Sequence, residues 1–239
     1  MPEAIFIFGN RISLYTILPI IALVVFLIAG NLLGKKYKFG YFKSIAYVFL
    51  TVLIRILLLN VTSWLFCGGT MGSVDHVRTV IYIPILLFPI TLLFRDKFAK
   101  VLDFIAPLLA LYHAIICLGC MFAGCCQGYP AAWGIYSNVA ETICFPIQPI
   151  EAATNAMISM VLLIMTNRKI QAGRLYAWYL VLYGGTRFFF EFFRNNHKVW
   201  CGLSEFSFQA LVAVLMGMVC LIITNKYFRE RKEFTDGAE

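Results

Sequence analysis

Four of the chain's eight cysteines, Cys117, Cys120, Cys125 and Cys126, lie within ten residues of one another. A C-x2-C pair followed by two adjacent cysteines resembles a set of metal ligands, and soft thiolates favour copper(I) or zinc. The same positions suit close packing of helices. Disulfides are also conceivable between Cys125 or Cys126 and the cysteines of the predicted outer loops, which are Cys67, Cys144 and Cys201. The spacing leaves these three roles open. Because no histidine lies near enough in the sequence for a convincing zinc site, we expect no metal and no cofactor.

A second candidate group lies in a later apolar segment. Arg187 and Glu191 are four residues apart, which places them on one face of a helix. A charge at the centre of a bilayer costs roughly 2.5–3.5 kcal/mol, so such residues rarely persist without a partner or a polar cavity. We therefore favour a functional role for this pair. The alternative is a structural ion pair near the end of the helix, with Arg194 reaching the lipid headgroups.

Arg55 lies in another apolar segment, which contains no acidic residue. It therefore needs a partner from a different helix, and Glu191, Glu151 and Asp103 are the candidates. For Asp103, capping or an interaction with the helix dipole is the simpler explanation, because it lies near the start of its own apolar segment.

Two histidines are candidates for a general base, since imidazole titrates near neutral pH. His76 lies in an expected loop, 68–78, beside Asp75 and Arg78. His113 lies in the middle of an apolar segment, where a hydrogen-bonded packing role fits equally well. For both histidines, the sequence supports a structural role at least as well as a catalytic one.

The composition indicates what kind of elements must position these residues. Of 239 residues, 61% are hydrophobic and 13% charged, whereas soluble domains carry about 25% charged residues. These values indicate an integral membrane protein. The net charge of +8 does not indicate nucleic-acid binding, because the basic residues form short clusters between apolar runs. We expect a lipid bilayer as a partner, and no nucleic acid.

Seven apolar segments predict an all-α bundle of about seven transmembrane helices, forming a single domain over residues 1–239. Lysines and arginines cluster after the first, third, fifth and seventh segments, which predicts a cytoplasmic C-terminus and an N-terminus outside. No cleavable signal peptide is expected, because a basic n-region and a small-residue cleavage pattern are missing. The segments are 13–34, 44–66, 79–94, 101–126, 150–166, 175–193 and 206–228.

The longest predicted loop is 127–149, on the outer side. The outer ends of the second, fourth and sixth segments also carry the unusual residues described above. We therefore expect any site to lie in the outer half of the bundle.

Parts of this sequence resemble the bacterial prolipoprotein diacylglyceryl transferases. The segment 103–108, followed by Gly119 and the run 123–128, resembles the signature region of that family. The segment Tyr183-Gly-x-x-Arg-Phe-x-x-Glu-Phe-Phe-Arg194 resembles the second hallmark sequence of the family. The resemblance covers most of the chain, and seven spans with an outer N-terminus agree with the family's topology.

Two shorter stretches extend the resemblance. Phe145-Pro-Ile-Gln-Pro-Ile-Glu151 is similar to the family's His-Pro-x-Gln-Leu-Tyr-Glu, and Ile12-Ser-Leu-Tyr15 is similar to the entry of its first helix. The substrate-binding residues that the resemblance implies are Tyr15, Arg55, Gly119, Gly124, Gln148, Glu151, Tyr183 and Arg194.

The resemblance implies a multi-pass transferase of the bacterial plasma membrane. Members of the family move the diacylglyceryl group of phosphatidylglycerol to the lipobox cysteine thiol of a secreted precursor protein, and release glycerol phosphate. Arg187 would hold the headgroup, since a guanidinium matches phosphate oxygens. Glu191 would fix the rotamer of Arg187, and His76 would be the base that takes the thiol proton.

The chain departs from the family where the signature reads Arg-x-Gly-Asn-Phe-x-x-Gly-Glu. Cys117, Cys120 and Cys125 replace its polar residues, so a phosphate-clamping arginine is missing, and Arg55 or Arg78 would have to replace it. The outer region is also short. The chain therefore resembles a cysteine-rich, divergent branch. Two other functions stay open: a membrane thiol protein that exchanges disulfides or binds a soft metal, and a non-catalytic lipid-binding relative.

Overall fold

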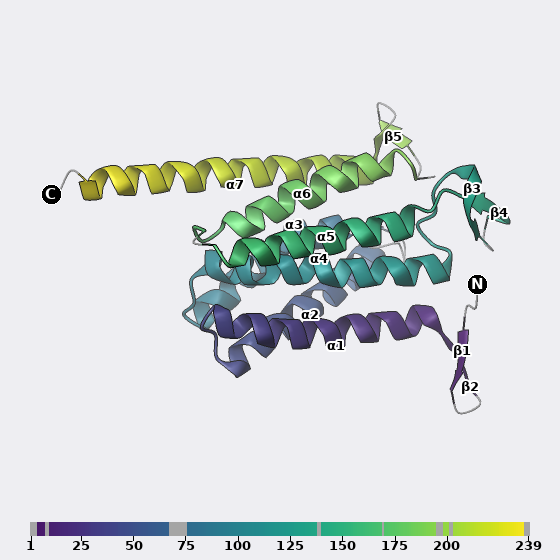
Figure 1. Cartoon of the computed structure of the whole chain (residues 1–239), viewed down its shortest axis with the longest axis horizontal. Coiled ribbons are helices and arrows are strands. Elements are labelled where there is room, and N and C mark those ends of the chain that lie inside the picture. Colours follow the sequence, from purple (N-terminus) through teal and green to yellow (C-terminus); the bar gives the residue numbers. More distant parts are fainter. Residues whose placement is uncertain are drawn as a thin grey trace.

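The structure is a computed structural model that describes residues 4–7, 10–66, 76–137, 140–168, 170–194, 198–200 and 203–236. Side chains are described within 17–58, 76–137, 140–168, 170–194 and 203–226. The described part contains seven long helices, as the apolar segments predict (Figure 1). They are α1 (Leu14–Lys36), α2 (Tyr41–Phe66), α3 (His76–Leu93), α4 (Phe98–Ala123), α5 (Ile147–Thr166), α6 (Arg174–Glu191) and α7 (Glu205–Asp236).

Six of these helices are long and apolar enough to cross a membrane. The exception is α6, which carries three charged residues, Arg174, Arg187 and Glu191, in only 18 residues. It packs against α4, α5 and α7, so its polar residues are enclosed by apolar helices. The fold is therefore an all-α membrane bundle, and the charged helix lies within it.

Three antiparallel hairpins lie together at one end of the bundle (Figure 1). We call this end the hairpin end, and the opposite end, where the lysine- and arginine-rich loops lie, the basic end. Which end faces the cytoplasm stays a prediction from the charge pattern. The outer loop predicted at 127–149 contains one hairpin and is shorter than expected, because α5 begins at Ile147. The hairpins pair β1 (Ala4–Ile7) with β2 (Asn10–Ser13), β3 (Pro130–Ser137) with β4 (Thr142–Cys144), and β5 (Lys198–Trp200) with β6 (Leu203–Ser204).

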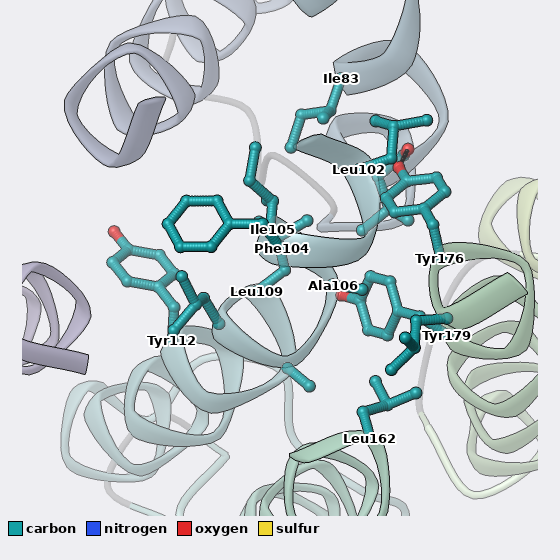
Figure 2. Packing of buried hydrophobic residues seen from close by; sticks show 14 of the residues in the cluster. Ile83, Leu102, Phe104, Ile105, Ala106, Leu109, Tyr112, Leu162, Tyr176 and Tyr179 are labelled. Atoms are coloured by element: carbon teal, nitrogen blue, oxygen red, sulfur yellow. Dashed lines mark hydrogen bonds between the residues drawn. The ribbon is translucent and has the colours of Figure 1, made fainter. Parts of the chain in front are cut away.

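The helix α4 is the centre of the bundle. Every residue of its segment 101–110 is buried. Figure 2 shows side chains of this helix in one cluster with residues of α3, α5 and α6. The outer faces of α1 and α7 instead expose large apolar side chains such as Ile28 and Ile222, as expected of helices in contact with lipid. The labelled members of the cluster are Ile83, Leu102, Phe104, Ile105, Ala106, Leu109, Tyr112, Leu162, Tyr176 and Tyr179.

Two features fix the position of α6. At Gly217 of α7, a Cβ atom would lie 2.8 Å from the carbonyl oxygen of Ala177, so glycine permits the close approach of α6 and α7. At the basic end, Asp103 accepts hydrogen bonds from the backbone N–H groups of Gly173 (2.6 Å) and Tyr176 (3.0 Å). Asp103 is thus a helix cap, as the sequence suggests, but it caps α6 instead of its own helix.

Candidate functional site

A cavity of about 180 Å³ lies at the hairpin end, between α2, α3, α4, α5, α6 and the first turn of α7. Most of the charged residues, histidines and cysteines that the sequence analysis identified as candidates line this cavity, although they come from five helices. The cavity therefore lies in the half of the bundle in which the sequence predicts a site. The lining residues are Arg55, His76, His113, Ile116, Cys117, Cys120, Cys125, Cys126, Gln148, Glu151, Arg187, Arg194 and Phe206.

The carboxylate of Glu151 is the centre of the polar network. Its side chain is only 2% exposed, and it projects from the first turns of α5. Arg194 donates a hydrogen bond to Oε2, and Nη1 of Arg187 lies 3.5 Å from Oε1. Nε2 of His113 lies 3.6 Å from the same Oε1. One buried anion therefore holds a histidine of α4, an arginine of α6 and an arginine three residues after the end of α6, which satisfies the requirement that buried charges be paired.

Arg187 and Glu191 lie on one face of α6, as their spacing predicts. Nη2 of Arg187 is 3.4 Å from Oε2 of Glu191. The hydroxyl of Ser204, the last residue of β6 and the residue before α7, donates a 2.7 Å hydrogen bond to Oε1 of Glu191. The guanidinium also lies over the ring of Phe206, 5.9 Å from its centroid. Arg187 is thus held in one orientation, with a side chain that is only 6% exposed and lines the cavity.

His76 is not a loop residue, as the sequence suggested, but the first residue of α3, and it is 2% exposed. Its Nδ1 accepts a hydrogen bond from Arg55, because a guanidinium only donates, and its Nε2 lies 3.0 Å from the hydroxyl of Tyr179. His113 stacks on His76 with ring centroids 4.0 Å apart. Tyr183 meets both rings edge-on.

For His113, the sequence left open whether it is a general base or a packing residue, and the structure places it in the site. Its Nε2 lies 3.5 Å from Sγ of Cys117 as well as near Glu151, and its Nδ1 has no hydrogen-bond partner among the described residues. The one available signal was the four-residue spacing from Cys117, which places both side chains on one face of α4.

Arg55 does not have the acidic partner that the sequence led us to expect. Within the described residues it makes no ion pair; it contacts His76 and lies over the ring of Tyr112, 5.3 Å from the centroid. Asp103, one of the suggested partners, lies at the basic end, far from the cavity. A cation–π contact and an imidazole acceptor therefore replace the expected salt bridge.

The end of α4 brings three cysteines together. The Sγ atoms of Cys120, Cys125 and Cys126 all lie within 4.8 Å of one another. Gly124 makes this possible, because its left-handed conformation (φ 67°) ends the helix and turns the chain back. The neighbouring thiols of Cys120 and Cys125, together with the nearby Arg194, lower the pKa of the Cys126 thiol.

Among the described residues, no other cysteine forms a disulfide with this group. Cys117 belongs to the cluster with His113 and Glu151, and Cys144 and Cys220 are free. The disulfide considered between Cys144 and the end of α4 is therefore not formed. Those considered for Cys67 and Cys201 lie outside the described residues.

Of the remaining predicted site residues, Gln148 and Arg194 line the cavity and Gly119 does not. The amide of Gln148 donates a 3.0 Å hydrogen bond to the carbonyl oxygen of Cys125, which ties the turn to α5. Gly119 does not line the cavity but packs against Leu18 of α1, 3.5 Å from where its Cβ would lie. The side chain of Tyr15 lies outside the described part of the chain. Burial opposes the charge of Arg194, but the carboxylate of Glu151 offsets this effect and raises the pKa of Arg194.

Comparisons with known proteins show which family the chain is similar to. A family model described as prolipoprotein diacylglyceryl transferase matches residues 78–224. A protein of Clostridium perfringens (strain 13 / Type A), named phosphatidylglycerol–prolipoprotein diacylglyceryl transferase 2, is 29% identical over 138 residues, which are 55% of this chain and 54% of that protein. A protein of Clostridium tetani (strain Massachusetts / E88), named phosphatidylglycerol–prolipoprotein diacylglyceryl transferase, is 27% identical over 127 residues, or 50% of this chain and 51% of that protein.

The chain therefore aligns with about half the length of each of these relatives. The family match includes Glu151, Arg187 and Arg194, whereas Arg55 and His76 precede it. Bacterial relatives and six apolar helices of sufficient length agree with the predicted multi-pass location in a bacterial plasma membrane.

Proposed function

Because this chain belongs to the prolipoprotein diacylglyceryl transferase family, we propose that its cavity transfers a diacylglyceryl group from phosphatidylglycerol to a thiol. The acceptor would be the lipobox cysteine of a secreted precursor protein. The observation that best supports this proposal is the buried group of Arg55, Arg187 and Arg194 at one cavity. Among the described residues, the carboxylates paired with these guanidinium groups are those of Glu151 and Glu191, so positive charge remains for a phosphate.

The proposed reaction forms one bond and breaks one. The acceptor sulfur attacks the glycerol carbon that carries the phosphate ester, and a carbon–sulfur bond forms as the carbon–oxygen bond breaks. The electron pair of the broken bond leaves with glycerol phosphate. Arg187 and Arg194 stabilise the negative charge that grows on the leaving phosphate, because buried guanidinium donors already held in position need little reorganisation.

The thiol proton requires a base, and the contacts favour His113 for this role. The resemblance implied His76, but both ring nitrogens of His76 have partners, Arg55 and Tyr179. His113 has one nitrogen near Glu151 and a second without a partner among the described residues. An imidazole that a carboxylate orients through one nitrogen, and whose buried second nitrogen has no partner among the described residues, can take up a proton as a general base. His76 then positions the ring on which it stacks.

Arg55 is the side chain that replaces the arginine missing from the signature region. It lines the cavity from α2, whereas Arg78, the other candidate, pairs with Glu205 of the last helix and is not a lining residue. Glu151 acts as a positioning residue, since it fixes both Arg187 and Arg194 without needing to touch the substrate.

The test is a transfer assay with the purified full-length protein in phosphatidylglycerol vesicles. A lipobox peptide should gain the mass of one diacylglyceryl unit and glycerol phosphate should appear in equal amount. A peptide with serine in place of the lipobox cysteine, and vesicles of phosphatidylcholine alone, are the matched controls. If the peptide gains no mass while the Clostridium perfringens relative modifies it under the same conditions, the proposed transfer is wrong.

The same assay distinguishes the roles of His113 and His76. We expect His113→Gln to lower kcat by about 100- to 10,000-fold, which is the usual contribution of a general base. His76→Gln should lower kcat less, because glutamine can still accept a hydrogen bond from Arg55. The reverse order of the two variants would contradict the assignment of His113. Phospholipid binding without any transfer by the unsubstituted protein would instead favour a non-catalytic lipid-binding relative.

A further inference from the structure

The proposed transfer leaves unused three sulfur atoms at the rim of the cavity. They belong to Cys120, Cys125 and Cys126, which we call the three-cysteine cluster. All three sulfurs lie within 4.8 Å of one another, although they come from the last turn of α4 and the residues after it. Cys125 is exposed and the other two are partly exposed, so a small ion can reach them from outside the bundle.

We propose that the three-cysteine cluster binds one copper(I) ion through its three sulfur atoms. In a trigonal site with metal–sulfur bonds of about 2.3 Å, the sulfurs lie about 4 Å apart. Small movements of the side chains would therefore complete the site. Thiolate sulfur is the soft ligand that copper(I) prefers, and binding would release the thiol protons.

The backbone holds these sulfurs together without a metal. Gly124 ends α4 in the left-handed conformation, and the backbone N–H of Cys125 donates a 3.2 Å hydrogen bond to the carbonyl oxygen of Cys120. Cys126 itself has a positive φ of 58°, which non-glycine residues adopt uncommonly. Gln148 holds the turn from α5 through its hydrogen bond to the carbonyl oxygen of Cys125. The turn is thus fixed in the form that groups the three side chains.

Two observations favour copper(I) over zinc. Structural zinc sites almost always have four protein ligands, whereas among the described residues this group contains three cysteines and no fourth cysteine, histidine or carboxylate. Three thiolates around a monovalent ion also leave a net negative charge. The guanidinium of Arg194, which lines the same cavity as Cys126, would offset part of that charge.

The test is a copper(I) titration of the reduced full-length protein in detergent, without oxygen, against a coloured copper(I) chelator. We expect one copper(I) per chain. Changing a residue that only contacts a metal ligand typically lowers metal affinity by about 10- to 100-fold. Because Cys120→Ser and Cys125→Ser each remove a ligand, each should lower the copper(I) affinity by more than this. Cys144→Ser and Cys220→Ser remove free cysteines outside the cluster and should leave the affinity unchanged.

Copper X-ray absorption of the unsubstituted protein provides a second measurement, which does not depend on how the variants fold. It should show three sulfur neighbours around the metal. The proposal is overturned if copper(I) does not bind, if the cluster variants bind it as tightly as the controls, or if zinc binds in preference. The proposal would also be overturned if the reduced protein lacked two titratable thiols because two cluster cysteines had formed a disulfide. Because no lipid or peptide is present, the result is independent of the transfer assay.

Discussion

Replacing Arg187 with lysine tests the proposed phosphate site most informatively, because the substitution keeps the charge and changes only its shape. The guanidinium reaches Glu151 at 3.5 Å and Glu191 at 3.4 Å with different nitrogens. A lysine ammonium is a point charge that cannot reproduce this fork. The ammonium would therefore pair with one of the two carboxylates. The second carboxylate or the lipid phosphate would then have no hydrogen-bond donor.

The size of the effect follows from the position of the side chain. Arg187 is only 6% exposed, so its interaction with a phosphate about 4 Å away is worth about 4 kcal/mol at the effective dielectric constant of a partly buried site. Loss of one preorganised donor to a developing anion typically costs about 100- to 1,000-fold in kcat. We expect Arg187→Lys to fall in this range, and Arg187→Ala at its upper end or beyond.

The measurement is the initial rate of peptide modification in phosphatidylglycerol vesicles, with helix content and thermal unfolding recorded for each variant. Arg78→Lys is the matched control. Arg78 pairs with Glu205, whose side chain is 60% exposed, and exposed pairs contribute little. This variant should stay within about threefold of the original rate. Should Arg187→Lys be folded and as active as Arg78→Lys, the proposed role of the guanidinium would be refuted.

Two further predictions concern the packing that holds the site. Glu151→Gln leaves Arg187 and Arg194 without their shared anion, so it should lower the free energy of unfolding by about 3–5 kcal/mol, measured by denaturant titration in detergent; an unchanged midpoint would contradict the central place of this carboxylate. At Gly217 even a Cβ atom would lie 2.8 Å from a backbone oxygen of α6. Gly217→Val should therefore lower the free energy of unfolding by about 1–3 kcal/mol in the same titration. At Gly185 a Cβ meets nothing within 4 Å, so Gly185→Ala should instead stabilise the helix by about 0.5–1 kcal/mol, and equal effects at the two glycines would show that close packing is not the cause.

Hydropathy predicted the seven helices because a membrane-spanning helix needs a long apolar segment, a signal that depends on no partner. The same signal failed at polar ends. His76 opens α3 but was assigned to a loop, because the residues beside it are polar. The helix α7 continues to Asp236 through a charged segment, eight residues beyond its predicted end. The short hairpins had no sequence signal of their own.

The site could be predicted only where one helix carries both partners. The four-residue spacing of Arg187 and Glu191 indicated their contact, and the structure contains it. Contacts between helices depend on which faces meet, and spacing within a helix does not contain that information. The sequence therefore indicated neither that Glu151 joins Arg187 and Arg194 nor that His113 stacks on His76.

The most direct test of the central claim is an experimental density map of the protein with a non-hydrolysable phosphatidylglycerol analogue in a lipid nanodisc. The proposal that this cavity binds an anionic headgroup predicts density for a phosphate within hydrogen-bonding distance of Arg187 or Arg194, with the acyl chains leaving between helices into the bilayer. A lipid bound only elsewhere on the protein, with both guanidinium groups unchanged and still enclosed by their glutamates, would contradict it.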